Sequence, residues 1–438
     1  MPDRDLVDRL RGMIRDMERA RGREGDAPQF PPVPRIGPSR ESSAPAGSSA
    51  AGSGLAPEAL KRGVFREVKP VSLESTDGLH SRVYRTVYPE GAAPELRQVP
   101  EAAFPAFRSL EPALESMDGW LFLDIETTGL TGAATVAFLV GLGRWTEDGF
   151  SVTQFFLRDR QDEEFMLDQV KSHLEDRPVM VTFNGKAFDL PVLQARFTMC
   201  GMRPPAPSRV HLDLLSLARN MGRRPEYGQS LKEAVRRFTG TVRDGDIPGN
   251  LIPALYFIYE REGDSSVLEP VMKHNRLDIL DMVCLLWVFG CVLSGQVDAG
   301  DAAALAGAGK LHLRKGNLDL ARRCLETAMA GKSGCAGPED AASLRLLGHV
   351  LRKQGDWRGA LDAWERVVSS AGPRDEDYLW LARCYEVASA DIVRSLEVVS
   401  RPIAAYEGSG QESPFLLSRR RKRLERLLKA KSARPAER

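Results

Sequence analysis

The chain has 438 residues, which is enough for two to three domains with large buried cores. Its 61 basic and 60 acidic side chains leave a formal net charge of +1, so bulk charge alone supplies no attraction to nucleic acid or to an anionic membrane. The six cysteines contain no Cys-x-x-Cys pair, which excludes a zinc ribbon or a disulfide framework and fits a reducing compartment.

The first 117 residues divide into three segments by composition. Residues 1–24 place apolar side chains at helical spacing among charges, which predicts an amphipathic helix. Residues 25–57 are rich in Pro, Ser, Gly and Ala, and they predict a disordered linker because such a segment cannot bury enough apolar surface to offset its chain entropy. Residues 58–117 contain strand-like pieces and predict a lead-in segment that packs on the domain that follows.

We expect a cytoplasmic protein without a membrane segment. The first ten residues, MPDRDLVDRL, carry charges where a secretory signal requires an apolar core. The longest apolar stretch, Ile279–Leu293, is shorter than a membrane-spanning helix and contains Asp281.

The central predicted domain covers residues 118–298 and alternates strands with helices. The predicted strands are 120–124, 136–145, 151–157 and 179–183, and the predicted helices are 161–175 and 186–200. Gly141 and Gly143 are only a weak indication of a dinucleotide site, because a third glycine and a following helix are missing.

Two acidic residues stand at the end of the first of these strands. Asp124 and Glu126 are two positions apart, so both carboxylates project from one face of the strand. Two like charges there repel each other and lose hydration unless a cation lies between them. Hard oxygen ligands favour Mg²⁺ or Mn²⁺. Alternatively, both acids point into water at an ordinary strand end.

Two further acidic segments follow along the chain. Asp189 comes after the apolar strand 179–183 and the turn at Asn184-Gly185, near the start of a helix. His274 and Asp278 are four positions apart in a helical stretch, so they share one helix face. Acids on a strand, on a loop and on a helix can converge at one edge of a sheet.

These three segments resemble the motifs of the DEDD exonucleases, and the whole chain resembles the bacterial YprB-like group most closely. Asp124-x-Glu126 followed by Thr127-Thr128-Gly129 resembles the first motif, Asn184-x-x-x-Phe188-Asp189 the second, and His274-x-x-x-Asp278 the third. The resemblance covers residues 115–295, and the later part of the chain more loosely. One departure concerns the last motif: DEDD families usually have Tyr four residues before the final Asp or His five residues before it, whereas here His stands at the Tyr spacing.

The resemblance implies an α/β domain with a ribonuclease-H-like mixed sheet flanked by helices, followed by an all-α domain of tetratricopeptide-like repeats. A meander of three strands followed by an alternating α/β half is the order that such a fold requires. It also implies a 3′–5′ exonuclease that hydrolyses single-stranded DNA or RNA with two Mg²⁺ or Mn²⁺ ions. The implied metal ligands are Asp124, Glu126, Asp189 and Asp278, His274 would orient or deprotonate the attacking water, and the implied substrate contacts are Thr127, Thr128, Gly129, Leu130, Asn184 and Lys186.

A locally basic segment separates the second and third motifs. His211 and Asp213 lie at a predicted strand-to-helix junction, where Asp213 is either a helix cap or a group supporting the metals. The basic side chains there are Arg219, Arg223, Arg224, Lys232, Arg236, Arg237 and Arg243, with Tyr227 among them. This strip either follows a phosphate backbone or is an ordinary solvated helix face.

The last third of the chain predicts helical hairpins over residues 302–410 and a basic tail over 411–438. Gly316-Asn317 recurs as Gly355-Asp356, with small residues at matching positions after each, which is typical of tetratricopeptide-like repeats. Such repeats indicate a protein partner, or else an extension that stabilises the enzyme. The unbroken basic run Arg419–Arg423 favours nucleic acid, with an acidic protein as the alternative.

Two rival functions remain open at this stage. One is a catalytically weak or inactive nuclease fold that serves as an interaction module for nucleic acid or protein. The other is a structure-specific endonuclease. No residue in the sequence identifies a reader of the RNA 2′-hydroxyl, so DNA and RNA are not distinguished.

Overall fold

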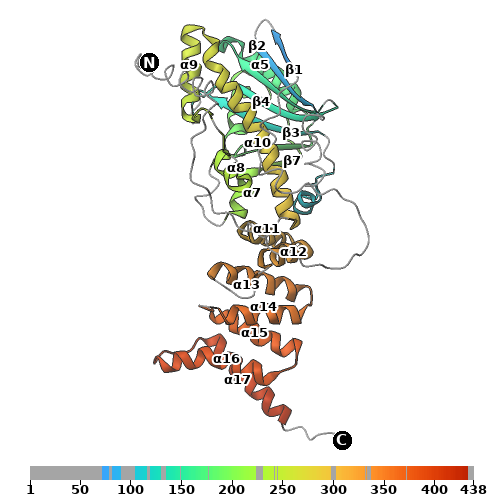
Figure 1. Ribbon diagram of the computed structural model, residues 1–438, viewed down its shortest axis with the longest axis vertical. Coiled ribbons are helices and arrows are strands. Elements are labelled where there is room, and N and C mark those ends of the chain that lie inside the picture. The colour runs from blue at the N-terminus through green and yellow to red at the C-terminus, as the bar shows by residue number, and fades with distance from the viewer. Residues whose placement is uncertain are drawn as a thin grey trace, which may run out of the picture. The chain divides into compact units, whose positions relative to one another are not determined.

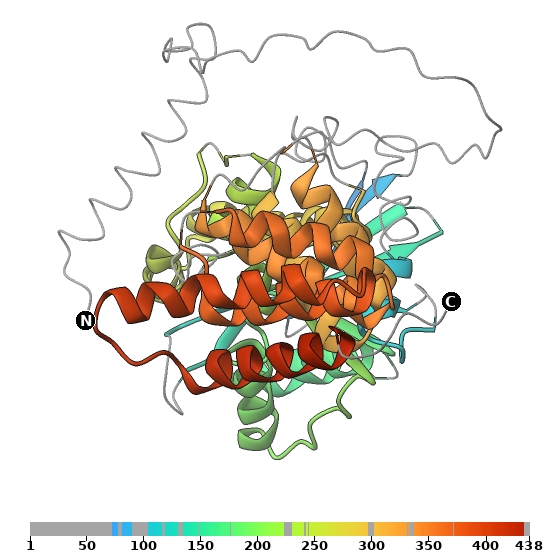
Figure 2. The ribbon, with the colours of Figure 1, turned by 90° about the horizontal axis from the view of Figure 1, so that it is seen from below.

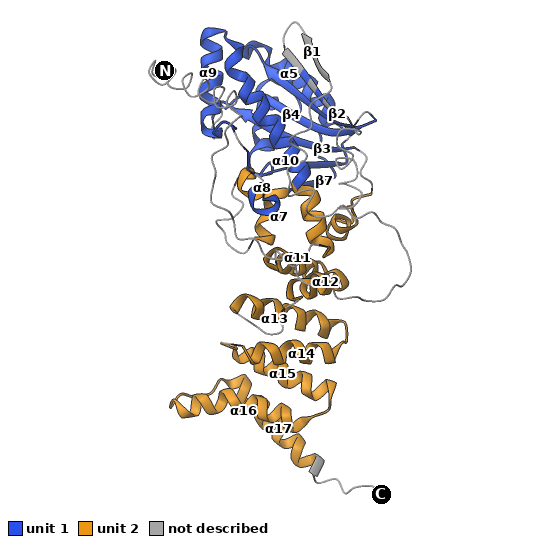
Figure 3. Ribbon diagram, viewed as in Figure 1, with its two compact units in different colours: residues 1–98, 118–213, 235–284 blue, residues 99–117, 214–234, 285–438 orange. Residues whose placement is uncertain are grey.

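The computed structural model describes residues 72–77, 81–89, 104–115, 119–129, 135–147, 149–175, 177–222, 230–240, 242–243, 245–296, 302–330, 332, 337–370 and 372–432. The predicted helix 1–24, the predicted linker 25–57 and Leu130 lie outside these ranges. The chain divides into two compact units (Figure 3). Unit 1 contains residues 1–98, 118–213 and 235–284, and unit 2 contains residues 99–117, 214–234 and 285–438.

Unit 1 is built on a seven-stranded mixed sheet with the strand order β1-β2-β5-β4-β3-β6-β7 (Figure 1). The strands are β1 (Ser72–Asp77), β2 (Ser81–Pro89), β3 (Trp120–Thr127), β4 (Ala137–Thr146), β5 (Gly149–Leu157), β6 (Val179–Thr182) and β7 (Val210–Asp213). Strands β3, β4 and β5 form an antiparallel meander, while β6 pairs parallel with β3 and β7 pairs parallel with β6. The predicted mixed sheet is confirmed.

The lead-in segment contributes two strands to the sheet. Strands β1 and β2 extend the sheet at β5 through antiparallel pairing. Residues 104–110 are helical and belong to unit 2. A strand with the alternation of residues 81–88 satisfies its backbone groups best at an open sheet edge, which β5 offers.

Helices lie on both faces of the sheet. The helices of unit 1 are α5 (Glu163–Leu174), α6 (Asp189–Met199), α9 (Ile252–Glu262) and most of α10 (Glu269–Ser294), while α8 (Leu231–Thr239) spans the division between the units. Phe155 of β5 packs edge-on against His173 of α5, with ring centroids 5.1 Å apart, so α5 covers the face opposite to that of the adjacent Gln154. The predicted helix 186–200 begins three residues later, because residues 183–188 form a turn, and Asp189 is therefore its first residue.

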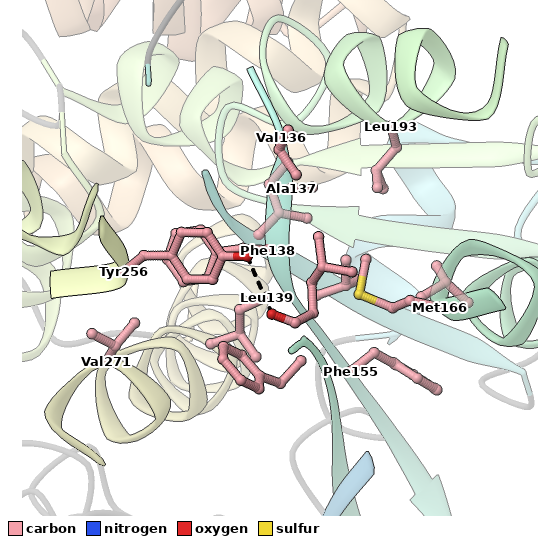
Figure 4. Close-up of a cluster of buried hydrophobic side chains, with 14 of the residues drawn as sticks. Val136, Ala137, Phe138, Leu139, Phe155, Met166, Leu193, Tyr256 and Val271 are labelled. Atoms are coloured by element: carbon pink, nitrogen blue, oxygen red, sulfur yellow. Dashed lines mark hydrogen bonds between the residues drawn. The ribbon is translucent and has the colours of Figure 1, made fainter. Parts of the chain in front are cut away.

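The apolar core of unit 1 joins the meander to α5, α6 and α9 (Figure 4). Phe138 stacks on Tyr256 with a centroid distance of 4.1 Å, and both rings are fully buried. The Tyr256 hydroxyl donates a hydrogen bond of 3.2 Å to the carbonyl oxygen of Leu157, which satisfies the one polar group of this ring.

Helix α10 lies against the other face, directly over two glycines of β4. A Cβ atom at Gly141 would approach the Asn275 side chain to 2.2 Å, and one at Gly143 would approach Ile279 to 2.4 Å. These glycines therefore serve close helix-to-sheet packing. By length and composition α10 and the turn before it could cross a membrane, but most of that apolar stretch is buried inside the protein, as in a core helix.

Unit 2 is a succession of helices, each packed on the next (Figure 2). Besides α7 (Leu214–Met221) it contains α11 (Ala302–Lys315), α12 (Leu318–Met329), α13 (Pro338–Lys353), α14 (Trp357–Val368), α15 (Asp375–Ala388), α16 (Ile392–Gly408) and α17 (Phe415–Ser432). The predicted hairpin turns at Gly316 and Gly355 lie between α11 and α12 and between α13 and α14.

The basic run Arg419–Arg423 lies on α17 and is partly neutralised within unit 2. Arg420 and Arg423 both pair with Glu386 of α15, and Arg421 pairs with Glu407 at 3.3 Å. Leu417 and Leu424 on the same helix are fully buried, so α17 is packed as part of the helical stack.

Candidate metal centre

Three elements bring the predicted acids of unit 1 together. Asp124 and Glu126 lie near the end of β3, Asp189 begins α6, and His274 and Asp278 occupy one turn of α10. One ligand atom from each of Glu126, His274 and Asp278 lies within 4.8 Å of the other two. Such spacing allows Glu126 and Asp278 to share one divalent cation with the imidazole of His274 beside it, because metal–ligand distances are about 2.0–2.6 Å.

Asp124 and Asp189 share the electrostatic field of this cluster. Burial raises the pKa of Asp124 well above its ordinary value, and the charges of Asp278, Glu126 and Asp189 raise it further. Burial, together with Asp213 and Asp278, raises the pKa of Asp189 to about 7, although the Ile125 N–H donates a 3.2 Å hydrogen bond to its carboxylate. Mutually repelling carboxylates with hard oxygen ligands fit a divalent cation, which would favour their ionised forms.

A chain of amide hydrogen bonds holds Asp124 in place. The side-chain NH₂ of Asn275 donates to Asp124 Oδ2 at 2.8 Å, and that of Gln154 donates to Asn275 Oδ1 at 2.9 Å. Asp124, Gly141 and Gln154 lie in one row across β3, β4 and β5, and Asn275 bridges the row above Gly141. Sequence reasoning missed Asn275 and Gln154, because only strand register and the placement of α10 show that they lie beside Asp124.

His274 is held by a carboxylate that the sequence analysis also missed. Its Nδ1 lies 2.8 Å from Asp246 Oδ1, and its Nε2 lies 3.5 Å from Asp278 Oδ2. Because an ionised carboxylate only accepts, Nδ1 carries a proton and Nε2 is directed toward the acid cluster. The unusual spacing of His274 before Asp278 is thereby compatible with a directed imidazole.

The interpretation of Arg243 as part of a solvated or phosphate-binding strip is wrong. Its guanidinium is buried among three carboxylates, at 2.5 Å from Asp278, 3.0 Å from Asp246 and 2.6 Å from Asp281. Burial alone would lower the pKa of Arg243, but the three carboxylates hold it above its ordinary value. Because the guanidinium is held by these carboxylates, it is not available to a phosphate.

The turn that carries Asp189 is ordered by β7. Asn184 has a left-handed backbone, with φ of 70°. The Asp213 carboxylate accepts hydrogen bonds from the backbone N–H of Asn184 at 2.9 Å and of Lys186 at 3.3 Å. Of the two roles considered for Asp213, the supporting one thus has direct contacts: it secures the turn leading to Asp189.

His211 supports the same turn through Thr182. Its Nε2 lies 2.9 Å from Thr182 Oγ1, which in turn accepts from the Gly185 N–H at 3.2 Å. Burial and the positive charge of Lys186 lower the pKa of His211 to about 4. The imidazole is therefore neutral near pH 7 and acts as a hydrogen-bonding group.

The residues after Glu126 form a second turn beside the acids. The pairing of β3 with β4 shifts register between Glu126 and Thr127. The Thr127 hydroxyl donates to the Gly129 carbonyl oxygen at 2.7 Å, and the Thr128 hydroxyl accepts from the Val136 N–H at 3.0 Å. Both hydroxyls thus shape the loop, and the Thr128 N–H is bonded as well, at 3.0 Å to the Val136 carbonyl oxygen.

Comparisons with known proteins agree with this architecture. Residues 121–288 match the RNase_H superfamily model, and residues 306–376 and 345–390 match the tetratricopeptide repeat model. The uncharacterized protein YprB of Bacillus subtilis (strain 168) is 30% identical over 292 residues, which cover 65% of this chain and 68% of that protein.

A solved structure gives a weaker match. It is the family B DNA polymerase from the hyperthermophilic archaeon Pyrobaculum calidifontis, with 16% identity and a TM-score of 0.32. The match covers 60% of this chain and 44% of the polymerase chain, and at this TM-score it supports no conclusion about activity.

Proposed function

The chain belongs to the YprB-like family, with an RNase H superfamily domain followed by tetratricopeptide repeats, and from this premise we propose that it is a metal-dependent 3′–5′ exonuclease. Its substrate would be single-stranded DNA or RNA in the cytoplasm. The observation that carries the proposal is the convergence of Glu126, His274 and Asp278 within 4.8 Å, beside two acids whose pKa values are raised by burial and by their neighbours.

Each acid has a definite task in this proposal. Glu126, Asp278 and Asp124 would hold the first cation, and Asp124 and Asp189 the second. Two Mg²⁺ or Mn²⁺ ions bound there would stabilise the charge that develops during an in-line phosphodiester displacement. Asn275 keeps the Asp124 carboxylate oriented, and the Asp213 contacts keep Asp189 at the start of α6.

His274 would act on the attacking water. Its Nε2 accepts a proton as the water oxygen attacks phosphorus and the bond to the leaving oxygen breaks. Asp246 holds Nδ1 at 2.8 Å and so fixes which nitrogen faces the water. The 3′–5′ polarity follows the family resemblance, by which the backbone of residues 127–130 and the turn at Asn184 and Lys186 would receive the terminal nucleotide.

End-labelled substrates test this function directly. Purified full-length protein is incubated with Mn²⁺ or Mg²⁺ and with 3′- and 5′-labelled DNA and RNA strands in parallel, with EDTA as the control. We expect stepwise release of mononucleotides from the 3′ end, no reaction in EDTA, and an intact circular single strand. A folded protein that degrades none of these strands overturns the proposal, and a cut circle would identify an endonuclease.

The role of Asp246 is tested separately. Asp246→Asn leaves a group that can also donate to Nδ1, so the other tautomer competes and kcat should fall about 10- to 100-fold. KM should change little, and Asp246→Glu should restore part of the rate. A rate unchanged in Asp246→Asn would show that His274 needs no positioning.

A second function is favoured by one specific observation. Arg243 already lies 2.5 Å from Asp278, so it competes with a cation for that carboxylate. The chain would then be an inactive nuclease fold that binds nucleic acid, with a protein partner on the repeats. Calorimetric titration with Mn²⁺ separates the two: saturable binding that disappears in Glu126→Gln favours the enzyme, and its absence favours the interaction module.

A further inference from the structure

Unit 2 contains a groove of about 860 Å³ between α15 and α17, with His349 of α13 beside them. On each of the two helices, the lining residues recur at positions i, i+3, i+4 and i+7, so each helix presents one face to the groove. These residues are Glu376, Leu379, Trp380 and Arg383 on α15, and Leu416, Arg419, Arg420 and Arg423 on α17. All of them belong to unit 2, so the groove is complete without unit 1.

The positive charge of this groove exceeds the negative charge beside it. Arg383 and Arg423 lie 3.7 and 3.0 Å from the carboxylate of Glu386, and Arg420 pairs with the same carboxylate. Burial lowers the pKa of Arg420, and the charges of Arg423 and Arg383 lower it further, although Glu386 opposes them. Glu376 adds one more carboxylate, so the four arginines of the lining still outnumber the acids beside them.

The side chains that carry this excess charge are accessible to a ligand. The side chains of Arg383 and Arg423 are 43% and 45% exposed. Arg419 is exposed as well, and within the described part of the chain it has no ion pair. On the same helix faces, Leu416 is 58% exposed and Leu379 is half-buried, which adds apolar surface to the groove. Guanidinium groups in excess beside accessible leucines match a ligand that has both carboxylates and apolar side chains.

A nucleic-acid strand fits this groove less well than a peptide does. Proteins that bind single strands without sequence preference stack the bases on open aromatic faces. In the groove, Trp380 has the guanidinium of Arg352 over its ring at 4.8 Å. The same ring lies parallel to Trp364 at 6.3 Å and meets His349 edge-on at 5.1 Å. Side chains of unit 2 therefore already occupy this ring, and the accessible lining consists of charge and aliphatic surface.

We propose that this groove binds an acidic peptide segment of a partner protein. Carboxylates of the segment would pair with Arg419 and Arg383, and its apolar side chains would cover Leu416 and Leu379. Of the two partners considered for the basic run Arg419–Arg423, the acidic protein is then the one that the groove fits. The proposal does not depend on nuclease activity, because these groups require neither a metal ion nor a strand.

Fluorescence anisotropy with defined peptides tests the groove. A labelled peptide of about 12 residues, in which leucines are spaced among glutamates, is titrated with the full chain in EDTA at about 0.15 M salt, which screens distant charges. We expect saturable binding of this Glu–Leu peptide. Two matched peptides, one with Gln for every Glu and one with Ser for every Leu, should each bind at least about tenfold more weakly, since each lacks one half of the recognised chemistry.

Substitutions in the groove should weaken the binding of the Glu–Leu peptide. We expect an affinity about tenfold lower for both Arg419→Glu and Leu416→Ser. The melting temperature should not change, because both side chains are exposed. Arg358→Glu is the matched control for the change in net charge, because Arg358 is an exposed arginine of α14 outside the lining, and its affinity for the peptide should equal that of the wild type.

Four outcomes would overturn the proposal. The first is the absence of saturable peptide binding up to millimolar concentration, and the second is an affinity that Arg419→Glu leaves unchanged. The third is an equal loss of affinity in Arg358→Glu and Arg419→Glu, because general charge attraction would then explain the binding. The fourth uses a labelled DNA strand in EDTA: if Arg419→Glu weakens its binding and the Glu–Leu peptide does not displace it, the groove is a nucleic-acid surface. Strand degradation with Mn²⁺ is measured separately, so its result does not affect any of these outcomes.

Discussion

Two acids, Asp377 in unit 2 and Asp124 in unit 1, have opposite surroundings. In unit 2, Asp377 receives two hydrogen bonds from Arg345, at 2.8 and 2.7 Å, and Asp340 pairs with Lys332 at 2.6 Å. In unit 1, Asp124 has carboxylates as its main charged neighbours, and its pKa is raised. A paired buried charge holds helices in register, whereas an unneutralised one reduces stability and indicates a place for a ligand.

The largest effect should come from breaking the acid cluster. Asp278→Asn should reduce nuclease kcat by about 10³-fold or more, because a metal ligand is lost. The melting temperature in EDTA should stay the same or rise, since repulsion at Asp124 decreases while Arg243 keeps Asp246 and Asp281. Initial rates on a labelled strand and thermal unfolding measure both. If the variant retains a tenth of the rate, or if it is unfolded, the contrast between the repelling acids of unit 1 and the paired acid of unit 2 is wrong.

The reverse pattern is expected for the paired acid of unit 2. Asp377→Ala removes the carboxylate that pairs with the mostly buried Arg345 and the acceptor for the Arg374 N–H, so the unfolding free energy should fall by about 3 kcal/mol. The rate per folded molecule should not change. Urea unfolding, monitored by tryptophan fluorescence, measures this loss of unfolding free energy. Glu326→Ala, which removes an exposed pair with Arg322, is the control and should cost less than about 0.5 kcal/mol.

A backbone substitution tests the support of Asp124. In Gly141→Ala the new methyl group would overlap Asn275, so we expect about a tenfold lower kcat and a loss of roughly 2 kcal/mol in stability. Gly249→Ala is the control, because a Cβ there meets no other atom within 4 Å. Equal behaviour of the two variants would mean that Asn275 does not position Asp124.

The smallest effect concerns pH. Asp189 has its pKa raised from 3.8 to about 7, so between these values the folded protein retains a proton that the unfolded chain has lost. Unfolding then releases a proton, and stability in EDTA should decrease from pH 5 to pH 8 by on the order of 2 kcal/mol. His211, with its pKa lowered to about 4, acts in the opposite direction because its unfolded form takes up a proton below pH 6.5.

The measurement is therefore the difference between wild type and Asp189→Asn across this pH range, in which the His211 contribution cancels. Adding Mn²⁺ at pH 8 should restore stability to the wild type more than to the variant, because bound cations favour the ionised carboxylate. A wild type and a variant with parallel pH profiles would show that Asp189 is not shifted.

The acids were identifiable from the sequence, but the groups that hold them were not. Asp124, Glu126, Asp189, His274 and Asp278 stand at strand ends or share a helix face, which local spacing reveals. Asn275 is 151 residues from Asp124, and Asp246 is 28 residues from His274. Arg243 was misjudged because a charge run in a sequence does not say which of its members is buried.

The order of strands and helices, the helical repeats and the acidic motifs were determined by the sequence itself, because hydrophobic period and turn residues act over short distances. Only the tertiary structure decided that β1 and β2 extend the sheet, that Gly141 admits Asn275, and that Gln154 donates a hydrogen bond to Asn275. Those outcomes depend on strand register and on how closely α10 approaches β4. Both are set by packing between residues far apart in the chain, which no local pattern encodes.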